Sequence, residues 1–323
     1  MSRRNERGVA LIIALVLVAL AAILATKLTF DGWLERRRAS GVMAAEQAFE
    51  FGLGAEALAA DVLAQDMQNS KTDTLAEAWA QPTQPLPINP QDDPEGEPIG
   101  TSQGELEDMQ GRFNLNSLGR VTQDGKQDPQ PLEQFQRLLA AVGVEPKWAG
   151  LARDWIDADD IPGSPDGAED QVYTSQTPPY RTGNWPMMSS SELMNLPGFG
   201  ADRYRKIAAY VTALPDAKTK INVCTASAVV LASLADNVNN DFGSPEVLAN
   251  SRKTGCFPDV ATFTSIVGPK AMAGLNDRID DKSHYFRLTT RITLGTTEFT
   301  LYSLLLRGNG GKIVPLLRSF GTL

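Results

Sequence analysis

An uncharged apolar run near the amino terminus constrains this chain more than any other feature. The segment VALIIALVLVALAAILA, residues 9–25, contains no charged residue. At about 1.5 Å per residue it forms a helix of roughly 26 Å, close to the hydrocarbon thickness of a bilayer. A polar leader, MSRRNERG, precedes it and carries three arginines. The sequence therefore predicts a membrane-spanning helix over residues 9–30, with the amino terminus in the cytoplasm and the head across the membrane.

The helix is expected to continue beyond the membrane. A secretory signal peptide would end in a small-residue cleavage site after a shorter apolar core, and no such site follows here. Helical apolar spacing persists as far as Ala60, and no proline occurs before Pro82. We expect residues 31–81 to extend the helix, although Arg36, Arg37 and Arg38 weaken the charge asymmetry that orients the span.

Composition and motifs exclude several functions. Acidic residues number 39 and basic residues 30, which argues against a broad phosphate-binding surface. The only histidine, His284, precedes a strand-like run and is best interpreted as structural. The chain has no GxSxG motif, no Ser/His/Asp arrangement and no phosphate loop, so we do not expect an enzyme.

The remaining chain predicts an antiparallel sheet interrupted by a helical domain. Residues 82–104 are rich in proline and acids and predict a linker. Residues 105–115 predict a first strand or a strand pair, and aromatic and β-branched runs at 284–294, 298–306 and 312–320 predict three more strands. A sheet built from 105–118 and 284–323 and packed on the first helix gives an α+β fold, with residues 119–283 as an all-α insertion.

The insertion contains an internal resemblance. RFNLNSL, residues 112–118, and KINVCTA, residues 220–226, share a basic, apolar, Asn, apolar order, and a helical pattern follows each. These segments resemble the starts of two copies of a small module of the sterile-alpha-motif-like kind, so two such modules are expected.

A rival interpretation of the insertion is nucleic-acid binding. LPGFG, residues 196–200, is similar to a helix-hairpin-helix turn, whose backbone amides meet DNA phosphate. Arg203, Arg205 and Lys206 lie nearby, but Asp202 and the acidic composition oppose phosphate. The alternative function is thus a membrane-anchored DNA receptor, whereas the main interpretation has no nucleic-acid partner.

The strongest chemical signal is an acidic loop at residues 154–173, DWIDADDIPGSPDGAEDQVY. No lysine or arginine balances its acids, and calcium accepts six to eight oxygens in flexible geometry. We expect one or two structural calcium ions; magnesium, which demands stricter geometry, and a solvated loop that binds nothing are the alternatives. The acids could instead form the carboxylate pair of a glycosidase, but such a pair needs a concave site with aromatic platforms, and we interpret the nearby aromatic residues as packing around the loop. The predicted ligands are Asp157, Asp159, Asp160, Asp166, Glu169 and Asp170.

The junction Arg7-Gly8-Val9 resembles the processing site of type IV prepilins and type II secretion pseudopilins. The resemblance implies cleavage between Gly8 and Val9 by a prepilin peptidase, methylation of the new terminus and retention of the span. The family usually has glutamate at the fifth mature position, where this chain has Ile13. A buried carboxylate in lipid is costly without a partner, so its absence suits a subunit with no neighbour on that side. An ordinary single-pass anchor without a peptidase site is the alternative.

The whole chain resembles the K-type minor pseudopilin, in which an all-helical insertion interrupts the pseudopilin sheet and an acidic run similar to WIDADDIPGSPDGAEDQVY, residues 155–173, accompanies calcium binding. This resemblance implies a subunit at the tip of a periplasmic pseudopilus that helps to initiate its assembly for export of folded proteins across the outer membrane. The implied partners are the I-type and J-type minor pseudopilins, the major pseudopilin filament, the prepilin peptidase and the inner membrane, with a single span and a periplasmic head.

The two cysteines, Cys224 and Cys256, belong to the head. Thiols oxidise readily on the far side of the membrane, so a disulfide closing a loop of about 33 residues is expected. Two unpaired buried thiols are the alternative.

Overall fold

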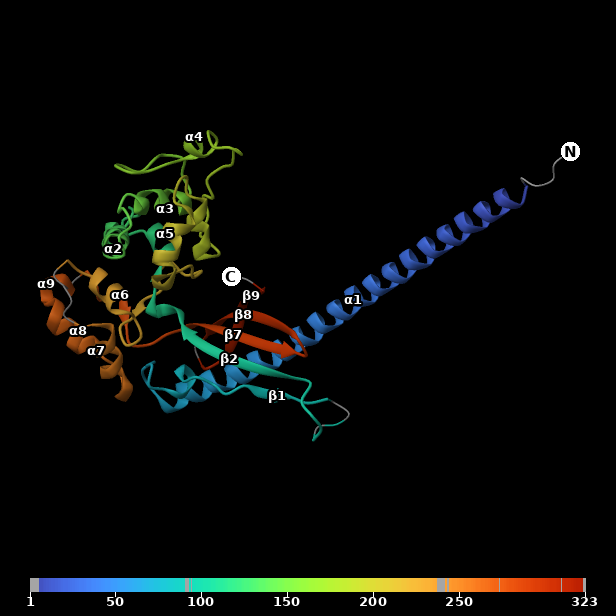
Figure 1. Ribbon diagram of the computed structural model, residues 1–323. Helices are drawn as coiled ribbons and strands as arrows, with labels where there is room; N and C mark the ends of the chain where they lie inside the picture. Colours follow the sequence, from blue (N-terminus) through green and yellow to red (C-terminus); the bar gives the residue numbers. More distant parts are fainter. Residues whose placement is uncertain are drawn as a thin grey trace.

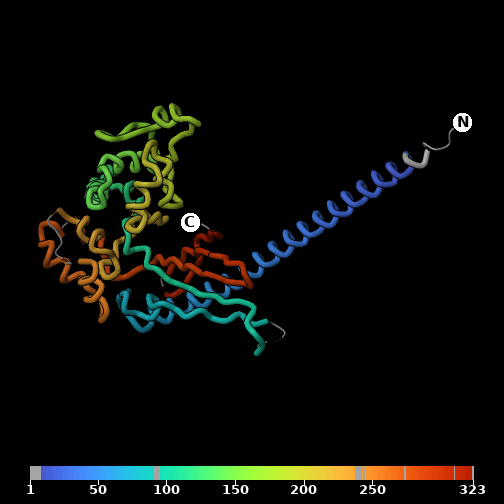
Figure 2. Tube along the Cα trace, viewed as in Figure 1, coloured from blue at the N-terminus to red at the C-terminus, as the bar shows by residue number. Residues whose placement is uncertain are grey.

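The fold consists of a long helix, a sheet that packs on its second half and a helical domain at the end of the head (Figure 1). The structure is a computed structural model that describes residues 6–323 except 91, 92, 94, 237–241, 243, 273, 309, 322 and 323. Helix α1 runs without a break from Glu6 to Asn69. Its amino-terminal half projects away from the head, and the helical domain lies at the opposite end (Figures 1 and 2).

Most of the projecting half of α1 consists of residues 9–25, which are apolar on all sides of the helix. Its most apolar 18-residue window has a mean hydropathy of 3.1 and no part of that window is buried in the protein. A helix that is apolar all round and uncovered by protein requires an apolar solvent. Among the described residues, α1 is the one helix long and apolar enough to cross a membrane.

The head sheet has five antiparallel strands in the order β1-β2-β7-β8-β9. The strands are β1 (Leu86–Ile88), β2 (Gly100–Asp108), β7 (Tyr285–Leu294), β8 (Thr297–Arg307) and β9 (Ile313–Phe320). Alternate residues of β7 are buried, as expected for a sheet with one face on a core. That core includes Phe286, Leu288 and Leu305 of the sheet and Leu63 of α1.

Three predicted boundaries are corrected by the structure. Helix α1 ends at Asn69 rather than 81, because the next segment turns inward to place the buried carboxylate of Asp73 against β8; the 3-10 helix η1 (Ala78–Ala80) follows. The predicted linker 82–104 contains β1 and the start of β2. Its Pro87 is compatible with a strand because β1 lies at the edge of the sheet, where proline is tolerated. Residues 113–118 leave the main sheet and enter the helical domain.

The helical domain comprises two successive modules, each closed by a short parallel strand pair. In the first, β3 pairs with β4; in the second, β5 pairs with β6. After η2 (Met109–Gly111), the first module contains β3 (Phe113–Asn114), η3 (Leu115–Gly119), α2 (Pro129–Ala141), α3 (Trp148–Ile156), α4 (Asp170–Tyr173), η4 (Ser190–Asn195), α5 (Gly200–Ile207), η5 (Ala208–Tyr210) and β4 (Val211–Thr212). The second contains β5 (Ile221–Asn222), α6 (Ala228–Ser233), α7 (Pro245–Ser251), η6 (Arg252–Thr254), α8 (Val260–Val267), α9 (Pro269–Met272) and β6 (Ile279–Asp280).

The two segments that resemble each other in sequence also have the same local structure. Asn114 ends β3, and its side-chain oxygen accepts the backbone N–H of Asn116 at 3.2 Å. Asn222 ends β5, and its side-chain oxygen accepts the backbone N–H of Cys224 at 2.9 Å. Both side chains are buried, so each asparagine stabilises the turn that leads from the strand into its module.

The modules share one hydrophobic core. Residues from both, such as Phe135 of α2 and Leu231 of α6, belong to the same buried cluster, and Arg137 donates to the carbonyl oxygen of Ser233 across the junction. Within the second module Cys224 and Cys256 form a disulfide, which confirms the predicted pairing.

Candidate functional site

The acidic loop folds back over the end of helix α3. Asp154, on the last turns of α3, is fully buried and its Oδ2 accepts the backbone N–H of Gly163 at 2.8 Å. Gly167 approaches so closely that an added Cβ would lie 2.2 Å from both that oxygen and the Gly163 nitrogen. Only glycine fits there, so the close approach fixes the path of the loop.

Three predicted ligands meet inside this loop. One carboxylate oxygen from each of Asp157, Asp159 and Glu169 lies within 4.8 Å of the others. Glu169 is 3% exposed, and neither of its carboxylate oxygens has a hydrogen-bond partner. Asp157 accepts from Gln127 Nε2 at 2.9 Å through one oxygen, while its other oxygen is buried without a partner.

Burial and mutual repulsion make these carboxylates hard to ionise. Burial, and then the nearby carboxylates of Asp154 and Asp157, raise the pKa of Glu169 to about 7. Burial, and then Asp154 and Asp159, raise the pKa of Asp157 to about 6. Burial also raises the pKa of Asp154. Asp159 is exposed, and one of its oxygens accepts the backbone N–H of Ile161 at 2.8 Å. The buried, unpartnered oxygens of Asp157 and Glu169 beside it suit a hard divalent cation, so the residues present fit the predicted calcium.

The other three predicted ligands do not join this group. Asp160 is exposed and accepts from Asn184 Nδ2 at 3.0 Å. Asp170 begins α4, accepts from the backbone and hydroxyl of Thr182, and pairs with Arg181. Asp166 is half-buried and likewise lies outside the group of three. The ligand set itself stays a prediction.

Sequence reasoning left out Asp154, whose Oδ1 is also buried without a hydrogen-bond partner. Its signal was its position: Asp154 lies only three residues before Asp157, which is the C-cap residue of α3.

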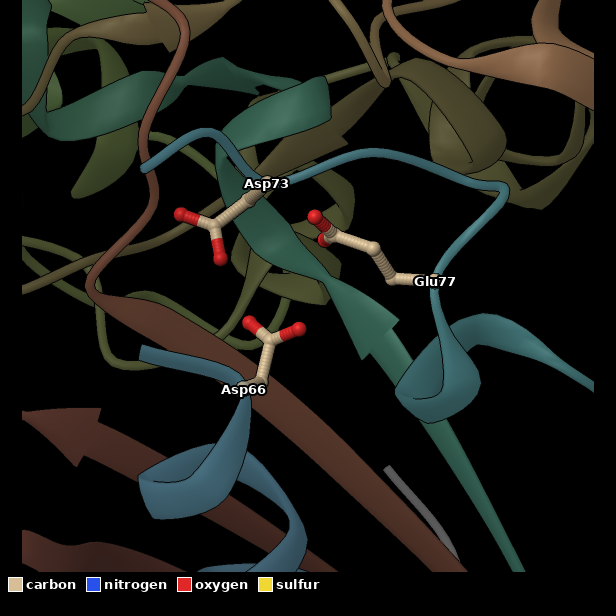
Figure 3. Close-up of side chains that lie close together, drawn as sticks. All are labelled: Asp66, Asp73 and Glu77. Carbon is tan, nitrogen blue, oxygen red and sulfur yellow. The ribbon is translucent and has the colours of Figure 1, made fainter. Parts of the chain in front are cut away.

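A second carboxylate group, Asp66, Asp73 and Glu77, lies where α1 meets the head (Figure 3). Here a side chain already supplies the positive charge, because Arg307 of β8 forms ion pairs with both Asp66 and Asp73. Glu77 accepts from the backbone of Thr74 and the indole of Trp79. We therefore interpret this group as a structural joint rather than as a metal site.

The helix-hairpin-helix-like turn has its basic residues engaged within the protein. Arg203 forms two hydrogen bonds with Glu145, each at 3.0 Å, and lies over the ring of Trp148. Arg205 pairs with Asp202, and Lys206 donates to the carbonyl oxygen of Gly143. The turn thus joins two packed helical segments, which removes the main support for phosphate binding.

The predicted processing junction lies at the exposed end of α1. Gly8 and Val9 belong to the first turns of the helix, and Val9 is 58% exposed. Residues 1–5 of the predicted leader lie outside the described residues. Ile13 is 55% exposed on the same uncovered half of the helix.

Comparisons with known proteins decide the family. Residues 111–216, which correspond to the first helical module, match the family model for type II secretion system (T2SS) protein K. The chain is 33% identical to type II secretion system protein K of Aeromonas hydrophila, over 99% of this chain and 98% of that protein. The chain belongs to the type II secretion system protein K family. The protein K of Pseudomonas aeruginosa is 34% identical over 99% of this chain and 94% of its own length.

A solved structure agrees with this family. The GspK-GspI-GspJ complex of enterotoxigenic Escherichia coli contains a chain with a TM-score of 0.76 and 26% identity, covering 88% of this chain and 100% of that one. This protein K is therefore a minor pseudopilin with the predicted α+β pseudopilin fold, and its family is structural rather than enzymatic. Its α1 is the single-pass membrane anchor of a secretion-system component.

Proposed function

We propose that this protein K caps the tip of a type II secretion pseudopilus and helps to initiate its assembly. The observation that carries the proposal is the place of the helical domain, which lies at the end of the head farthest from the amino terminus of α1 (Figure 1). Subunits added above this one would have to occupy the space that the two modules fill. A head of this shape suits the last position of a filament.

The partners we propose are the I-type and J-type minor pseudopilins, with the major pseudopilin filament below them. The solved relative was determined together with GspI and GspJ. In this chain, the part of α1 between the span and the sheet leaves Val42 and Met43 60% and 63% exposed. Beside them is a hollow of about 630 Å³ that reaches Phe49 of α1 and Phe320 of β9. Exposed apolar side chains along a helix suit packing against the helices of other pseudopilins.

We further propose that the prepilin peptidase cleaves between Gly8 and Val9 and that Val9 becomes the methylated amino terminus. The span then holds the protein in the inner membrane with its head in the periplasm. The Cys224–Cys256 disulfide supports that compartment, because disulfides persist where the environment is oxidising. Ile13, in place of the usual glutamate, supports a subunit that has no neighbour above it.

The acidic loop is proposed to bind structural calcium through Asp157, Asp159 and Glu169, with Asp154 beside them. The ion would neutralise Asp157 and Glu169, which have buried oxygens without a hydrogen-bond partner, and the exposed Asp159 beside them. Its role would be to hold the loop against α3 and so stiffen the first module at the end of the head.

Processing and secretion test the main proposal together. Gly8→Ala should leave the chain uncut, so that intact-mass measurement finds the leader retained, and secretion should be lost while the chain stays in the membrane. Gly32→Ala is the matched control, since an added Cβ there meets nothing within 4 Å on the same helix. If the chain of the Gly8→Ala strain had the mass of the processed wild-type chain and secretion were normal, the proposal would be contradicted.

Tip placement needs its own measurement. Isolated pseudopili labelled with antibody against the helical domain should carry label at one end. Label spaced along the length of the fibres would contradict the placement of this protein at the tip.

A further inference from the structure

Three consecutive arginines lie just beyond the membrane span, on the side where the positive-inside tendency disfavours them. If the span covers residues 9–30, as the proposed function requires, its 22 residues measure about 33 Å. Trp33 then lies roughly one turn beyond the hydrocarbon, and Arg36, Arg37 and Arg38 follow within about 12 Å. Cytoplasmic loops, not translocated ones, normally carry the excess of arginine.

Processing makes this imbalance larger. Cleavage after Gly8 removes Arg3, Arg4, Arg7 and Glu6, a net charge of +2 from the cytoplasmic flank. The new amino terminus at Val9 leaves one positive charge on the cytoplasmic side, whereas Lys27 and the three arginines, against the acids Asp31 and Glu35, leave a net charge of two on the other. The mature protein therefore keeps its surplus positive charge on the periplasmic side of the membrane.

The side chains of Arg37 and Arg38 point back toward the span. The guanidinium carbon of Arg37 lies 5.0 Å from the centroid of the Trp33 ring. Nη1 of Arg38 lies 2.9 Å from Oε1 of Glu35. Both contacted residues lie about one turn nearer the membrane, in keeping with the tilt of helical side chains toward the amino terminus. The charged groups are thus directed at the headgroup layer rather than away from it.

The rest of the soluble helix has the opposite charge. Between residues 39 and 70 the sequence has no lysine or arginine. The acidic residues there are Glu46, Glu50, Glu56, Asp61 and Asp66. The three arginines next to the bilayer, followed by the acidic part of the helix, are complementary in charge to a negatively charged membrane surface.

The angular spread of the arginines favours lipid over a protein partner. Successive residues of a helix are separated by about 100°, so three in a row cover about 200° of its circumference. A packed helix would contact a narrower stripe, whereas headgroups surround the helix on every side. All three arginines are exposed, and Trp33, 51% exposed, has the amphipathic ring typical of membrane interfaces.

We propose that Arg36, Arg37 and Arg38, with Trp33, form a binding site for the phosphates of anionic lipids in the periplasmic leaflet. Guanidinium groups bind phosphate oxygens through paired hydrogen bonds, and Trp33 fixes the depth of the helix at the interface. This site would hold the processed subunit at one depth until it enters the filament. The inference rests on the proposed topology, but not on tip placement or on calcium.

The test compares lipid retention by the full chain in detergent. Native mass spectrometry with equimolar phosphatidylglycerol and phosphatidylcholine should show that the wild-type chain prefers phosphatidylglycerol, by about fivefold for each arginine engaged. The triple variant R36Q/R37Q/R38Q should lose the preference, and R36K/R37K/R38K should keep most of it. The control K126Q/R205Q/K218Q removes the same charge from exposed head positions and should keep the wild-type preference.

A second measurement reports depth in vesicles that contain both lipids. Lipids brominated near the headgroup should quench the fluorescence of Trp33 in the wild-type chain. The signal reports Trp33 because the other tryptophans lie in the head, Trp79 in η1, Trp148 and Trp155 in α3 and Trp185 between α4 and η4. The triple glutamine variant should change the depth of quenching. Equal retention of both lipids by wild type and variant, with unchanged quenching, would overturn the inference and leave acidic groups of neighbouring subunits as the partners. If that occurred while the chain was still cut at Gly8, the proposed function would stand.

Discussion

Asp73 and Arg307 form a buried ion pair that joins the segment after α1 to strand β8. The side chains are 4% and 6% exposed, and the guanidinium also reaches Asp66 of α1 at 3.2 Å. The same guanidinium donates to the carbonyl oxygen of Ser283, at the return from the second helical module. One arginine therefore links the long helix, the sheet and the insertion.

Removing this arginine should destabilise the head strongly. In Arg307→Met, the buried carboxylate of Asp73 and the half-buried carboxylate of Asp66 would lose their counter-charge, and breaking a buried pair in this way costs about 3–5 kcal/mol. Urea unfolding of the chain in detergent should show a loss of this size. Arg291→Met on β7 is the control, because its pair with Glu105 is 49% and 65% exposed and should contribute less than about 1 kcal/mol. Equal losses in the two variants would contradict the assigned role.

The disulfide should contribute much of the stability of the second module. Cys224 and Cys256 are 32 residues apart, and a loop of this length corresponds to about 3–4 kcal/mol of reduced unfolded-state entropy. Adding a reductant should lower the free energy of unfolding of the wild-type chain by that amount, seen as a lower urea midpoint. The Cys224→Ala/Cys256→Ala chain should be equally weak with and without reductant. If the urea midpoint of the wild-type chain stayed the same after reduction, with the thiols shown to be free, the disulfide would not stabilise the module.

Calcium should stabilise the first module. At a calcium concentration about 100 times the dissociation constant, linkage predicts about 2.7 kcal/mol, which corresponds to a rise of roughly 5–11 °C in the melting temperature. Asp157→Asn with Glu169→Gln should abolish the rise. Glu133→Gln with Asp202→Asn removes the same charge from exposed positions elsewhere in the module and should keep the rise. The same rise in the first double variant as in the wild type would exclude the loop as the site.

Local patterns in the sequence were sufficient for the elements that form by local rules. The uncharged run predicted the projecting half of α1, and the three late strands were placed at 284–294, 298–306 and 312–320, within one residue of β7, β8 and β9. Pairings between distant residues could not be seen in this way. Asp73 is 234 residues from Arg307, so nothing near Asn69 showed that the helix had to stop there. Pro87 argued against a strand because the sequence does not show which strand forms the edge of a sheet.

The candidate metal site shows the same difference between what local sequence patterns predict and what depends on the folded chain. The sequence showed an excess of acids in one loop, but not which of them converge. Asp170 was as plausible as Glu169 in the sequence, yet in the structure it accepts hydrogen bonds from Thr182 while Glu169 turns into the loop. Asp154 opens the same acidic segment but was not among the predicted ligands, and the structure places its carboxylate beneath the loop, where it accepts the backbone N–H of Gly163.

The acidic loop should also make stability depend on pH in a way that calcium reverses. Burial raises the pKa of Asp157 to about 6 and of Glu169 to about 7, from ordinary values near 4. The folded chain therefore binds more protons than the unfolded chain between about pH 4 and 7, so without calcium the contribution of these groups to stability is present below pH 4 and is lost as pH rises through 6 and 7. Calcium requires the deprotonated carboxylates, so its stabilisation should grow over the same interval. Burial likewise raises the pKa of Asp66 and Asp108 to about 6, so these groups also lower the stability of the fold as pH rises, whether or not calcium is bound.

The measurement compares melting temperatures from pH 5 to 8 with calcium and with a chelator. The two sets of values should diverge as pH rises in the wild-type chain and stay parallel in Asp157→Asn/Glu169→Gln. A calcium effect in the wild-type chain that does not vary with pH would show that these two carboxylates do not bind the ion.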